Sequence, residues 1–378
     1  MNNFARSFFT LTLVPTRNLI ESRFVMKKNK FILFAIILLA IVVLGVLSMK
    51  IFGFGFFADD TPPTPVNLEN VVSPLDAELK AGVNVNGLEG VWSFKHAMKY
   101  LSKNSTYKNI LSQGFDHIRI PINFCLLYSE ETDAFDEKKM SKFDKILDFA
   151  EAYGLYTFID FHGWWEFGAD YAADSQKFLR IWELVAERYR DRSPYIAFEL
   201  VNEPPIKTMP VSKLNPLQSK ALEVIRKTNP DRLVLFAAPD GNQPWLLKDM
   251  VVPEDDNIAV AVHIYHPGDF THQGFTWANR EAGKQVRLND EMMNELKWNL
   301  DETKKFIDKT GLPVFLNEFG LNLKLADKKD IAVYLSTITE FCRENNVPWA
   351  FWGYNNQEMA LYANGKWDME TLDALFLR

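Results

Sequence analysis

Two glutamates stand at the ends of short apolar runs that have the pattern of buried β-strands. Glu203 lies in Phe198–Pro204, where an Asn-Glu pair precedes a proline that cannot continue a strand. Glu318 ends a similar run in Leu312–Gly320. A carboxyl group at a strand end is costly to bury and useful as a proton donor or acceptor. Together the two glutamates predict acid/base or nucleophilic chemistry, provided that the fold brings them side by side.

The composition fits a large enzyme domain and argues against nucleic-acid binding. The chain has 378 residues, enough for one large domain or two small ones with complete cores. Its formal net charge is −7, and no basic, aromatic-interleaved patch is visible. The 10 tryptophans can fill a core or stack on sugar rings. Trp182 and Trp298 fall in helical patterns and are expected in the core.

Three segments precede the expected catalytic domain at residues 71–378. Residues 1–30 form a leader that we interpret as a cytoplasmic tail, or as sequence upstream of a true start at Met26. Residues 31–57 contain a long apolar run behind a basic flank, which predicts a transmembrane signal anchor or a signal peptide. We favour an uncleaved anchor, because the run approaches the ~20 residues that span a bilayer. Residues 58–70 are Pro-rich and predict an extended linker, so that the domain lies outside the cytoplasm, in the periplasm or at the cell surface.

Residues 71–378 alternate short apolar runs with amphipathic helical patterns. The expected strands are Gly82–Asn86, His117–Ile122, Tyr156–His162, Ile196–Asn202, Leu233–Ala237, Ile258–Tyr265, Val314–Glu318 and Trp349–Trp352. The expected helices include Met140–Tyr153, Ser175–Tyr189, Gln218–Thr228, Glu291–Thr310 and Lys329–Asn345. Eight strands interleaved with helices predict an α/β fold with a parallel sheet, and their number favours a closed (β/α)₈ TIM barrel. No Gly-x-Gly-x-x-Gly motif or P-loop follows the first strand, which argues against a nucleotide-binding sheet.

Ionisable side chains gather where these strands end, and a TIM barrel places its active site there. The alternation of strand side chains gives an inward-facing set: His117, Arg119, Asp160, His162, Glu199, Glu203, His263, Tyr265, Glu318 and Trp352. So many polar groups at one barrel mouth are costly unless they pair or act. We expect Glu199 and Asp160 to be buried supporting partners, and His117 to be a packed histidine.

A pair of carboxyl groups at the ends of opposite strands fits cleavage of a glycosidic bond. One protonates the leaving oxygen, while the other attacks the anomeric carbon or activates water. Arg119 would keep a neighbouring glutamate ionised, and Tyr265 could hydrogen-bond the same carboxylate. That charge would raise the pKa of the second glutamate and keep it protonated as the acid. Asn202 can donate to a sugar hydroxyl, and Trp352 offers a flat platform for the ring.

Histidine spacing offers a metal-site alternative. His263 and His266 are separated by two residues, and His162 and His272 lie elsewhere in the chain. The first two fall on a strand and its loop, rather than on the helix that carries a His-Glu-x-x-His site. We therefore predict no metal ligands.

The chain resembles glycoside hydrolase family 5 over roughly residues 75–365. Seven motifs carry the likeness in order: Gly82–Asn84, Arg119–Pro121, Ile159–His162, Phe198–Pro204, His263–Tyr265, the segment around Glu318, and Ala350–Gly353. Phe270–Gly274 also resembles a loop of bacterial endoglucanase-like members. The resemblance implies a retaining enzyme with the acid/base Glu203 on the fourth strand and the nucleophile Glu318 on the seventh. Retention would require the two carboxyl groups to lie ~5–5.5 Å apart.

The resemblance also implies a substrate-binding set and no cofactor. The residues that match the family's positions around the −1 sugar are Arg119, His162, Asn202, His263, Tyr265 and Trp352. Neither a metal nor an organic cofactor is implied. Gly163–Glu166 departs from several relatives, which leaves the substrate contacts on that side open.

We interpret the protein as a hydrolase of β-linked glucan, with endo-1,4-β-glucanase activity as the leading interpretation. Mannan, xyloglucan or β-1,3-glucan remain open as substrates, and transglycosylation remains open as the reaction. A non-catalytic glycan-binding barrel is a further alternative, disfavoured because both glutamates and their expected supporting residues are present. The expected partners are a β-linked polysaccharide or oligosaccharide and, through the N-terminal helix, a membrane. The catalytic domain is expected to be monomeric.

Overall fold

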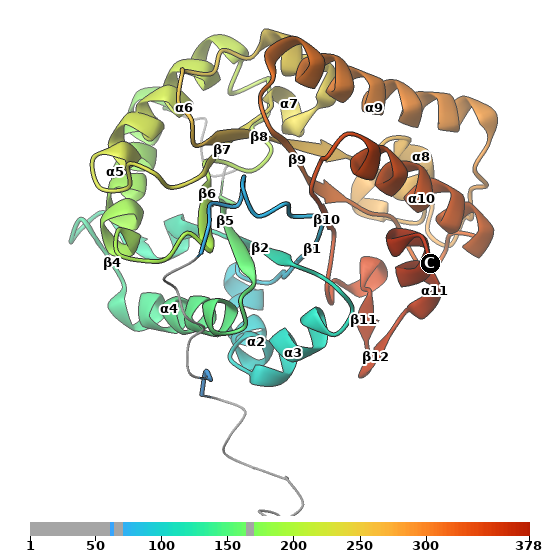
Figure 1. Ribbon diagram of the computed structural model, residues 1–378, viewed down its shortest axis with the longest axis horizontal. Coiled ribbons are helices and arrows are strands. Elements are labelled where there is room, and N and C mark those ends of the chain that lie inside the picture. Colours follow the sequence, from blue (N-terminus) through green and yellow to red (C-terminus); the bar gives the residue numbers. More distant parts are fainter. Residues whose placement is uncertain (1–60, 64–70, 164–169) are drawn as a thin grey trace, which may run out of the picture. The chain divides into compact units, whose positions relative to one another are not determined.

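The computed structural model describes residues 61–63, 71–163 and 170–378 (Figure 1). The expected leader, the anchor at residues 31–57 and most of the linker lie outside these residues, as do residues 164–166 of the segment after His162. The described residues of the range 60–378 belong to one compact unit. In the described part of the chain, no helix combines the length and apolar character needed to cross a membrane.

The core of the domain is a closed barrel of parallel strands in the order β1-β10-β9-β8-β7-β6-β5-β2. Their bounds are β1 Ala81–Asn84, β2 His117–Ile122, β5 Tyr156–Phe161, β6 Ile196–Glu199, β7 Val234–Ala237, β8 Ile258–Ile264, β9 Val314–Phe319 and β10 Trp349–Phe351. All eight strand candidates appear in the barrel, which confirms the (β/α)₈ TIM barrel predicted from the alternating pattern. By chain order, β6 is the fourth barrel strand and β9 the seventh.

Helices surround the barrel on the outside (Figure 1). The longer ones are α2 Val91–Leu101, α3 Asn104–Leu111, α4 Glu137–Ala152, α5 Tyr171–Tyr189, α6 Val211–Arg226, α9 Asp290–Thr310, α10 Lys328–Glu344 and α11 Met369–Phe376. Short helices and hairpins decorate the loops: η2 Phe124–Leu126, β3 Tyr128–Ser129, β4 Ala134–Phe135, α7 Pro239–Asn242, η4 Pro244–Asp249, α8 Gly268–Thr271, η5 Thr276–Ala278, η6 Gln357–Met359, β11 Tyr362–Ala363 and β12 Lys366–Trp367. The five helices named from the sequence are present. Helix α6 begins well before the expected Gln218, because it accommodates Pro216 in its interior.

Local chemistry sets the helix ends. The side chains of Asp136 and Asn289 accept hydrogen bonds from the backbone N–H groups of the first turns of α4 and α9. Helix α9 is followed by the capping residue Gly311, whose φ of 69° lies in the left-handed region that glycine adopts without strain. These caps define the N-terminal ends of α4 and α9 and the C-terminal end of α9.

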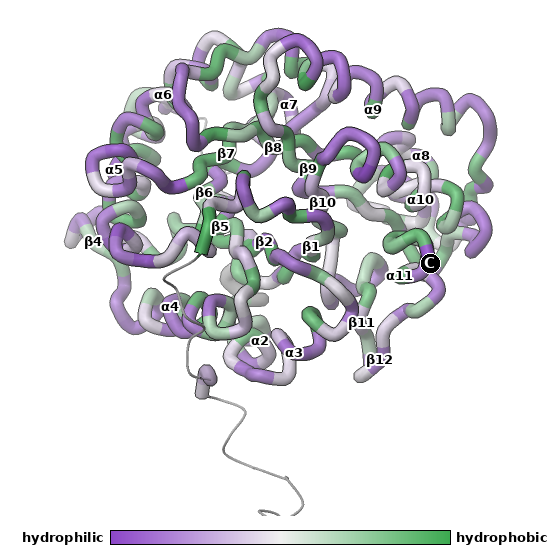
Figure 2. The backbone as a smooth tube through the Cα atoms, in the orientation of Figure 1, coloured by the Kyte–Doolittle hydropathy of each residue, from purple (hydrophilic) through white to green (hydrophobic). Residues whose placement is uncertain are grey.

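The barrel interior is apolar at one level and polar at the next. Phe158 and Phe315 pack with ring centroids 5.1 Å apart and belong to a small buried cluster that also contains Ala197, Ala259 and Ala261. A larger apolar core holds most of the remaining buried side chains. In Figure 2, strands β7 and β8 are coloured as hydrophobic, whereas the outer helix α9 is largely hydrophilic. The apolar level is the floor beneath the polar layer of the barrel.

Two expectations about individual residues need correction. Strand β6 stops at Glu199, short of the expected Asn202, so Glu203 lies in the following loop with φ 41° rather than on the strand. Trp182 is fully buried as expected, but Trp298 is 47% exposed and stacks on Trp245 with ring centroids 5.7 Å apart. A helical pattern identifies an apolar face, but it does not require every aromatic residue of the helix to be buried in the core. Trp298 packs against one neighbouring ring at the surface instead.

Candidate active site

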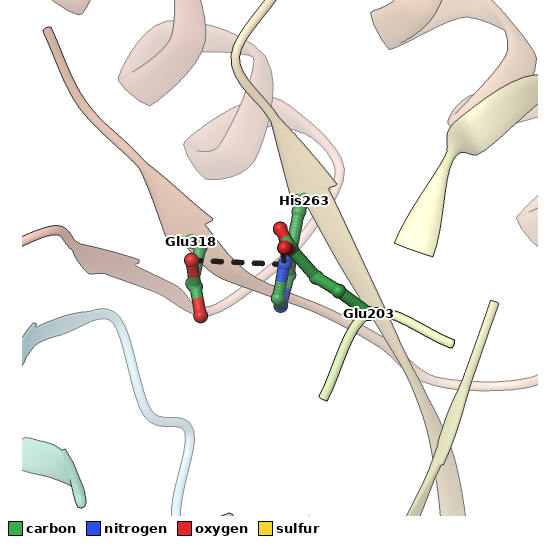
Figure 3. A group of neighbouring side chains, drawn as sticks. All are labelled: Glu203, His263 and Glu318. Atoms are coloured by element: carbon green, nitrogen blue, oxygen red, sulfur yellow. Dashed lines mark hydrogen bonds and ion pairs between the residues drawn. The ribbon is translucent and has the colours of Figure 1, made fainter. Parts of the chain in front are cut away.

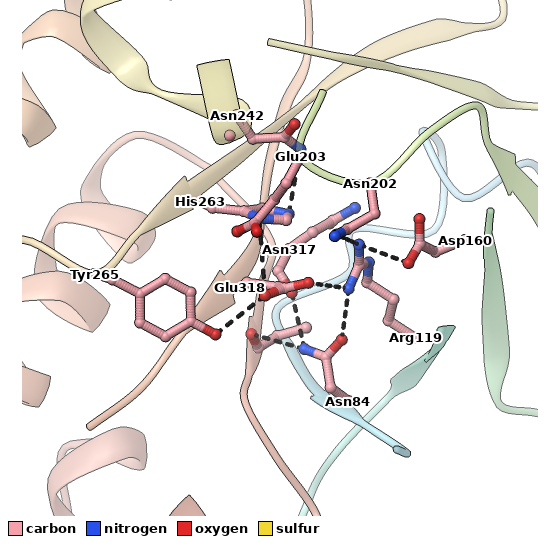
Figure 4. Close-up of polar contacts among 12 residues, drawn as sticks. Asn84, Arg119, Asp160, Asn202, Glu203, Asn242, His263, Tyr265, Asn317 and Glu318 are labelled. Carbon is pink, nitrogen blue, oxygen red and sulfur yellow. Dashed lines mark hydrogen bonds and ion pairs between the residues drawn. The ribbon is translucent and has the colours of Figure 1, made fainter. Parts of the chain in front are cut away.

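Arg119 on β2 is the centre of the polar layer and is fully buried. Its guanidinium binds Glu199 on β6 through two hydrogen bonds of 2.7 and 2.8 Å. It also contacts Asp160 on β5 at 3.0 Å and Glu318 on β9 at 2.5 Å (Figure 4). The planar fork of an arginine suits this arrangement, because it presents five fixed donors to several acceptors at once. The predicted supporting role of Glu199 is confirmed.

Asp160 and His162 form the side of the layer that comes from β5. The Oδ2 atom of Asp160 lies 2.6 Å from Nδ1 of His162. Burial alone would lower the pKa of His162, but the adjacent Asp160 carboxylate more than offsets it and raises the pKa above its ordinary value. His117 is buried, pairs with Asp116 and packs edge-on against Phe158, which confirms the packed histidine.

Two asparagines complete the network, and the sequence analysis did not single them out. Asn84 on β1 accepts a hydrogen bond from Arg119 at 3.0 Å and donates one to the carbonyl of Asn317 at 2.8 Å. Asn317 on β9 donates to Glu199 at 2.6 Å. Both lie inside segments already marked as motifs, so a signal was available in the preference of buried amides for hydrogen-bond partners.

A register shift in β9 brings two successive side chains into the layer. Between β8 and β9, Val262 pairs with Leu316, whereas His263 pairs with Glu318. Asn317 is thus the extra residue of a β-bulge, and such bulges redirect side chains near active sites. In a regular strand, neighbouring side chains would point to opposite faces. The bulge explains how Asn317 reaches Glu199 while Glu318 reaches Arg119.

Glu318 is 3% exposed and is surrounded by hydrogen-bond donors. Besides Arg119, the phenol of Tyr265 donates to its Oε2 at 3.0 Å. Burial raises the pKa of Glu318, and the charge of Arg119 opposes this rise. Both donors favour the ionised carboxylate, as the sequence analysis predicted.

Glu203 sits in a different environment. Its side chain is 39% exposed, and its Oε1 lies 2.9 Å from Nδ1 of His263. Burial raises the pKa of Glu203, which favours the protonated acid, while the charges of His162 and Arg119 oppose the rise. A carboxylate oxygen of Glu203, one of Glu318 and a ring nitrogen of His263 all lie within 4.8 Å of one another (Figure 3). This spacing fits two carboxyl groups that act on opposite sides of one bond in a retaining mechanism.

The same three side chains are close enough to surround a cation, but their pairing favours a hydrogen-bonded group. Burial lowers the pKa of His263 to about 4, so its ring is neutral at neutral pH. Glu318 is already paired with Arg119. His266 pairs with Glu295 at 2.7 Å and is not part of the group formed by Glu203, His263 and Glu318. Among the described residues, the two-residue spacing of His263 and His266 therefore does not bring both rings to one site.

A cleft of about 320 Å³ opens above the two glutamates. Its lining comprises His162, Glu203, Tyr265, His272, Phe275, Trp277, Glu318, Trp352 and residues 356–359. The rings of His162 and Trp352 stack with centroids 5.8 Å apart, and Trp277 is 71% exposed and stacks on Phe275. The aromatic surfaces fit the C–H faces of sugar rings.

The sequence-predicted residues thus fall into two groups. His162, Tyr265 and Trp352 line the cleft with Glu203 and Glu318. Arg119, Asn202 and His263 are buried behind the glutamates. The sequence analysis missed residues 356–359, which follow β10, because nothing in their types marks them as cleft residues.

Comparison with known proteins agrees with this geometry. A model of the cellulases, glycosyl hydrolase family 5, matches residues 76–358. Endoglucanase H of Acetivibrio thermocellus is 26% identical over 333 residues, covering 84% of this chain and 35% of the relative. Endoglucanase C of the same species is 24% identical over 323 residues, covering 75% of this chain and 93% of the relative. The crystal structure of cellulose synthase subunit Z from Clostridioides difficile matches with a TM-score of 0.72 at 30% identity, over 79% of this chain and 99% of that chain.

The chain therefore spans about a third of Endoglucanase H and nearly all of the other two proteins. The family model covers the whole barrel up to the loop after β10, including the segments that carry both glutamates. From this match, the chain belongs to the cellulase family, glycosyl hydrolase family 5, a family of glycoside hydrolases.

Proposed function

We propose that this protein hydrolyses internal bonds of β-linked glucan, as an endo-1,4-β-glucanase that retains the anomeric configuration. Glu318 is the nucleophile and Glu203 is the acid/base. The observation that carries the proposal is the pair of glutamates, with carboxylate oxygens within 4.8 Å and unlike hydrogen-bond environments. Glu318 accepts hydrogen bonds from Arg119 and from the phenol of Tyr265. The side chain of Glu203, by contrast, is 39% exposed.

The reaction proceeds in two displacements. A carboxylate oxygen of Glu318 attacks the anomeric carbon while Glu203 gives its proton to the departing glycosidic oxygen, which leaves a glycosyl-enzyme ester. The ionised Glu203 then takes a proton from water, and the hydroxide oxygen attacks the same carbon and releases Glu318. Each step inverts the carbon, so the product keeps the original configuration.

The surrounding residues support the different roles of the two glutamates and the binding of the sugar. Arg119 is fully buried and therefore acts on the sugar only through Glu318, whose negative charge it stabilises. The amide oxygen of Asn202 accepts from Arg119 at 2.9 Å. This contact fixes the amide plane and directs the NH₂ group toward Nε2 of His162, 3.4 Å away, a residue that lines the cleft. Trp352, stacked on His162, supplies the platform beneath the ring.

We favour glucan as the substrate because the two endoglucanases that the chain resembles are named for its hydrolysis.

We place further sugar units along the cleft toward Trp277, which offers an exposed indole. Replacing Trp277 by Ala should raise KM for a soluble β-1,4-glucan about fivefold, since an aromatic contact contributes roughly 1 kcal/mol. Steady-state kinetics on carboxymethylcellulose measure this, with Trp298→Ala, an exposed tryptophan outside the cleft lining, as the matched control. Equal KM changes in both variants would contradict it.

The pH profile of kcat/KM should be bell-shaped. Glu203 must be protonated for the first step, and burial raises its pKa, so activity persists above the pH at which an ordinary glutamate ionises and falls as pH rises further. Glu318 must be ionised, and its pKa is also raised by burial, so activity is lost as pH falls through that value. A dinitrophenyl cellobioside, whose leaving group needs no proton, should lose much of the basic limb. An unchanged basic limb with this substrate would exclude Glu203 as the acid.

Product analysis tests the function itself. The purified protein is incubated with soluble β-1,4-glucan, mixed-linkage glucan, β-1,3-glucan, xyloglucan and mannan, and the oligosaccharides are separated over time. The proposal predicts a ladder of oligosaccharides from β-1,4-glucan early in the reaction. Release of only one short product would indicate exo action, and cleavage of mannan alone would move the protein to another substrate class. Longer oligosaccharides made from shorter ones would indicate transglycosylation.

We also propose a membrane-anchored, monomeric enzyme outside the cytoplasm, in the periplasm or at the cell surface. The basic flank and apolar run at residues 31–57 support the anchor, and the Pro-rich residues 58–70 support a tether. Fractionation of cells with the native protein tests this. Enzyme that remains with membranes after salt washing and is cut by external protease fits the proposal, whereas a soluble cytoplasmic enzyme refutes it.

A second candidate role is the trimming of a β-glucan as it is synthesised. The 30% identity with a cellulose synthase subunit, together with the expected anchor, favours this alternative. Deleting the gene and measuring the length of exported β-1,4-glucan distinguishes the two roles. Longer or misassembled polymer indicates trimming, whereas unchanged polymer with lost growth on glucan indicates degradation.

A further inference from the structure

Asn242 lies directly behind the histidine that contacts Glu203. It is the last residue of α7, in the turn that follows β7, and its side chain is fully buried. Its amide nitrogen Nδ2 lies 3.2 Å from Nε2 of His263, and Nδ1 of the same ring lies 2.9 Å from Oε1 of Glu203 (Figure 4). A continuous chain of contacts thus joins β7, β8 and the loop of the acid/base.

The contact with Asn242 determines which ring nitrogen of His263 carries hydrogen. With Nδ2 facing the ring, the amide donates and Nε2 accepts, which places the single hydrogen of a neutral ring on Nδ1 and leaves Asn242 Oδ1 buried without a partner among the described residues. His263 is buried and its pKa is lowered to about 4, so the ring is neutral at neutral pH. The Nδ1–H group therefore donates to Oε1 of Glu203.

This tautomer directs the proton of Glu203. Because Oε1 accepts from His263, the acid proton of Glu203 belongs on the other oxygen, Oε2, from which it can go to the departing glycosidic oxygen. In the opposite tautomer, Nδ1 would carry a lone pair and the carboxylic acid would donate its proton to the ring. That proton would then be turned away from the substrate.

The turn that carries Asn242 also holds the loop of Glu203 through the backbone. Gly241 N–H donates to the carbonyl of Pro204 at 3.2 Å, and Ile206 N–H donates to Oδ1 of Asp240 at 3.2 Å. Residues 240–242 have φ values of 53°, 78° and 60°, in the left-handed region that favours Gly, Asn and Asp. The sequence Asp240-Gly241-Asn242 matches this requirement at every position.

We propose that Asn242 is a positioning residue for the acid/base. It fixes the His263 tautomer with hydrogen on Nδ1, and so keeps the proton of Glu203 on the oxygen that faces the leaving group. The proposal rests on the proposed function for its catalytic consequence, while the tautomer itself is a property of the folded protein. It adds a residue of the fifth barrel strand's loop to the machinery, which neither the motifs nor the cleft lining indicated.

The variant Asn242→Gly tests the consequence, because glycine readily keeps the left-handed backbone and removes the side chain that contacts His263. Loss of one hydrogen bond to a buried group should lower kcat/KM for cellotetraose on the order of 10-fold. The value for dinitrophenyl β-cellobioside should change less than about threefold, because that leaving group departs without protonation. Equal losses on both substrates, as a purely structural defect would give, or no loss on either would overturn the proposal.

Gln243→Leu is the matched control in the same turn. Within the described part of the chain, its amide donates to the carbonyl of Gly241 at 3.3 Å and makes no hydrogen bond with His263. Both substrates should keep their wild-type kcat/KM in this variant.

A direct measurement on the full wild-type chain keeps the proposal testable if the glycine variant fails to fold. In ¹⁵N-histidine-labelled protein, NMR shifts distinguish a protonated from an unprotonated ring nitrogen, and His263→Gln identifies its signals among the 6 histidines. We expect Nδ1 protonated and Nε2 unprotonated at pH 7, and the reverse pattern or a cationic ring would overturn the proposal. If no glycoside is hydrolysed at all, the proposed function fails, while the tautomer remains measurable.

Discussion

Replacing Glu318 by Gln should abolish turnover of β-1,4-glucan while leaving the fold intact. The amide cannot form the glycosyl-enzyme ester, and loss of a catalytic nucleophile lowers kcat on the order of 10⁴–10⁶-fold. The side chain keeps its volume, its remaining oxygen can still accept from Arg119, and its new NH₂ group can donate to the hydroxyl oxygen of Tyr265, so unfolding by urea should change little. Kinetics on cellotetraose and on an aryl cellobioside measure the effect.

The matched variants Glu318→Ala and Glu203→Ala separate the two roles with azide as an added nucleophile. Without the Glu203 acid, an aryl cellobioside still forms the glycosyl-enzyme, and azide should release it as the β-azide. Without the Glu318 nucleophile, azide enters from the opposite side and should give the α-azide. The same anomer from both variants, or near-normal activity of either one without azide, contradicts the assignment.

Replacing Arg119 by Met should destabilise the protein strongly and impair catalysis. The change leaves the carboxylates of Asp160, Glu199 and Glu318 in the barrel without the guanidinium that pairs with them. Breaking a buried ion pair from one side costs about 3–5 kcal/mol of unfolding free energy. Urea denaturation followed by tryptophan fluorescence gives the unfolding free energy.

Arg119→Met should also move the acidic limb of kcat/KM to higher pH. The pKa of Glu318 is already raised by burial, and the charge of Arg119 opposes that rise, so its loss raises the pKa further. Ionised Glu318 would then be lost at a higher pH than in the wild type. Arg188→Met is the control, since that arginine pairs with Glu137 and Asp144 on the helix surface and should affect neither measurement strongly. Comparable effects of the two substitutions would show that the buried network around Arg119 contributes no more to stability and to the acidic limb than a surface ion pair does.

Sequence patterns sufficed for the architecture because they follow from the physics of burial. Strands β2 and β5 appear within one residue of their expected bounds, since apolar residues recur at every second position in both. The same reasoning predicted that Arg119, Glu199 and Glu318 would meet, because inward-facing charges at one level of a barrel must pair.

The geometry of the reacting groups depended on local irregularities that carry little sequence signal. Glu203 was placed on the fourth strand, but it lies in a loop with φ 41°, and the β-bulge at Asn317 aims Glu318. A strict period of two cannot reveal either feature. Asn242 escaped notice for a related reason: its contact with His263 joins neighbouring strands' loops, and only the left-handed run from Asp240 hints at a special turn.

Cleft-lining residues beyond the strands were the least predictable part. The 71% exposure of Trp277 in the cleft follows from the loop after β8 rather than from its residue type. Residues 356–359 line the same cleft from the loop after β10. Loop conformation depends on contacts made at a distance in the chain, which residue types alone do not encode.

Trapping of the covalent intermediate tests the central claim most directly. The wild-type protein is treated with 2,4-dinitrophenyl 2-deoxy-2-fluoro-β-cellobioside, digested, and analysed by mass spectrometry for the modified residue. The fluorine slows both steps, and the good leaving group lets the first one proceed, so the glycosyl-enzyme should accumulate. The account predicts one sugar per chain, attached to Glu318, with activity returning as the label is released. Labelling of another carboxylate, or an active enzyme that never acquires a label and yields the inverted anomer, would contradict it.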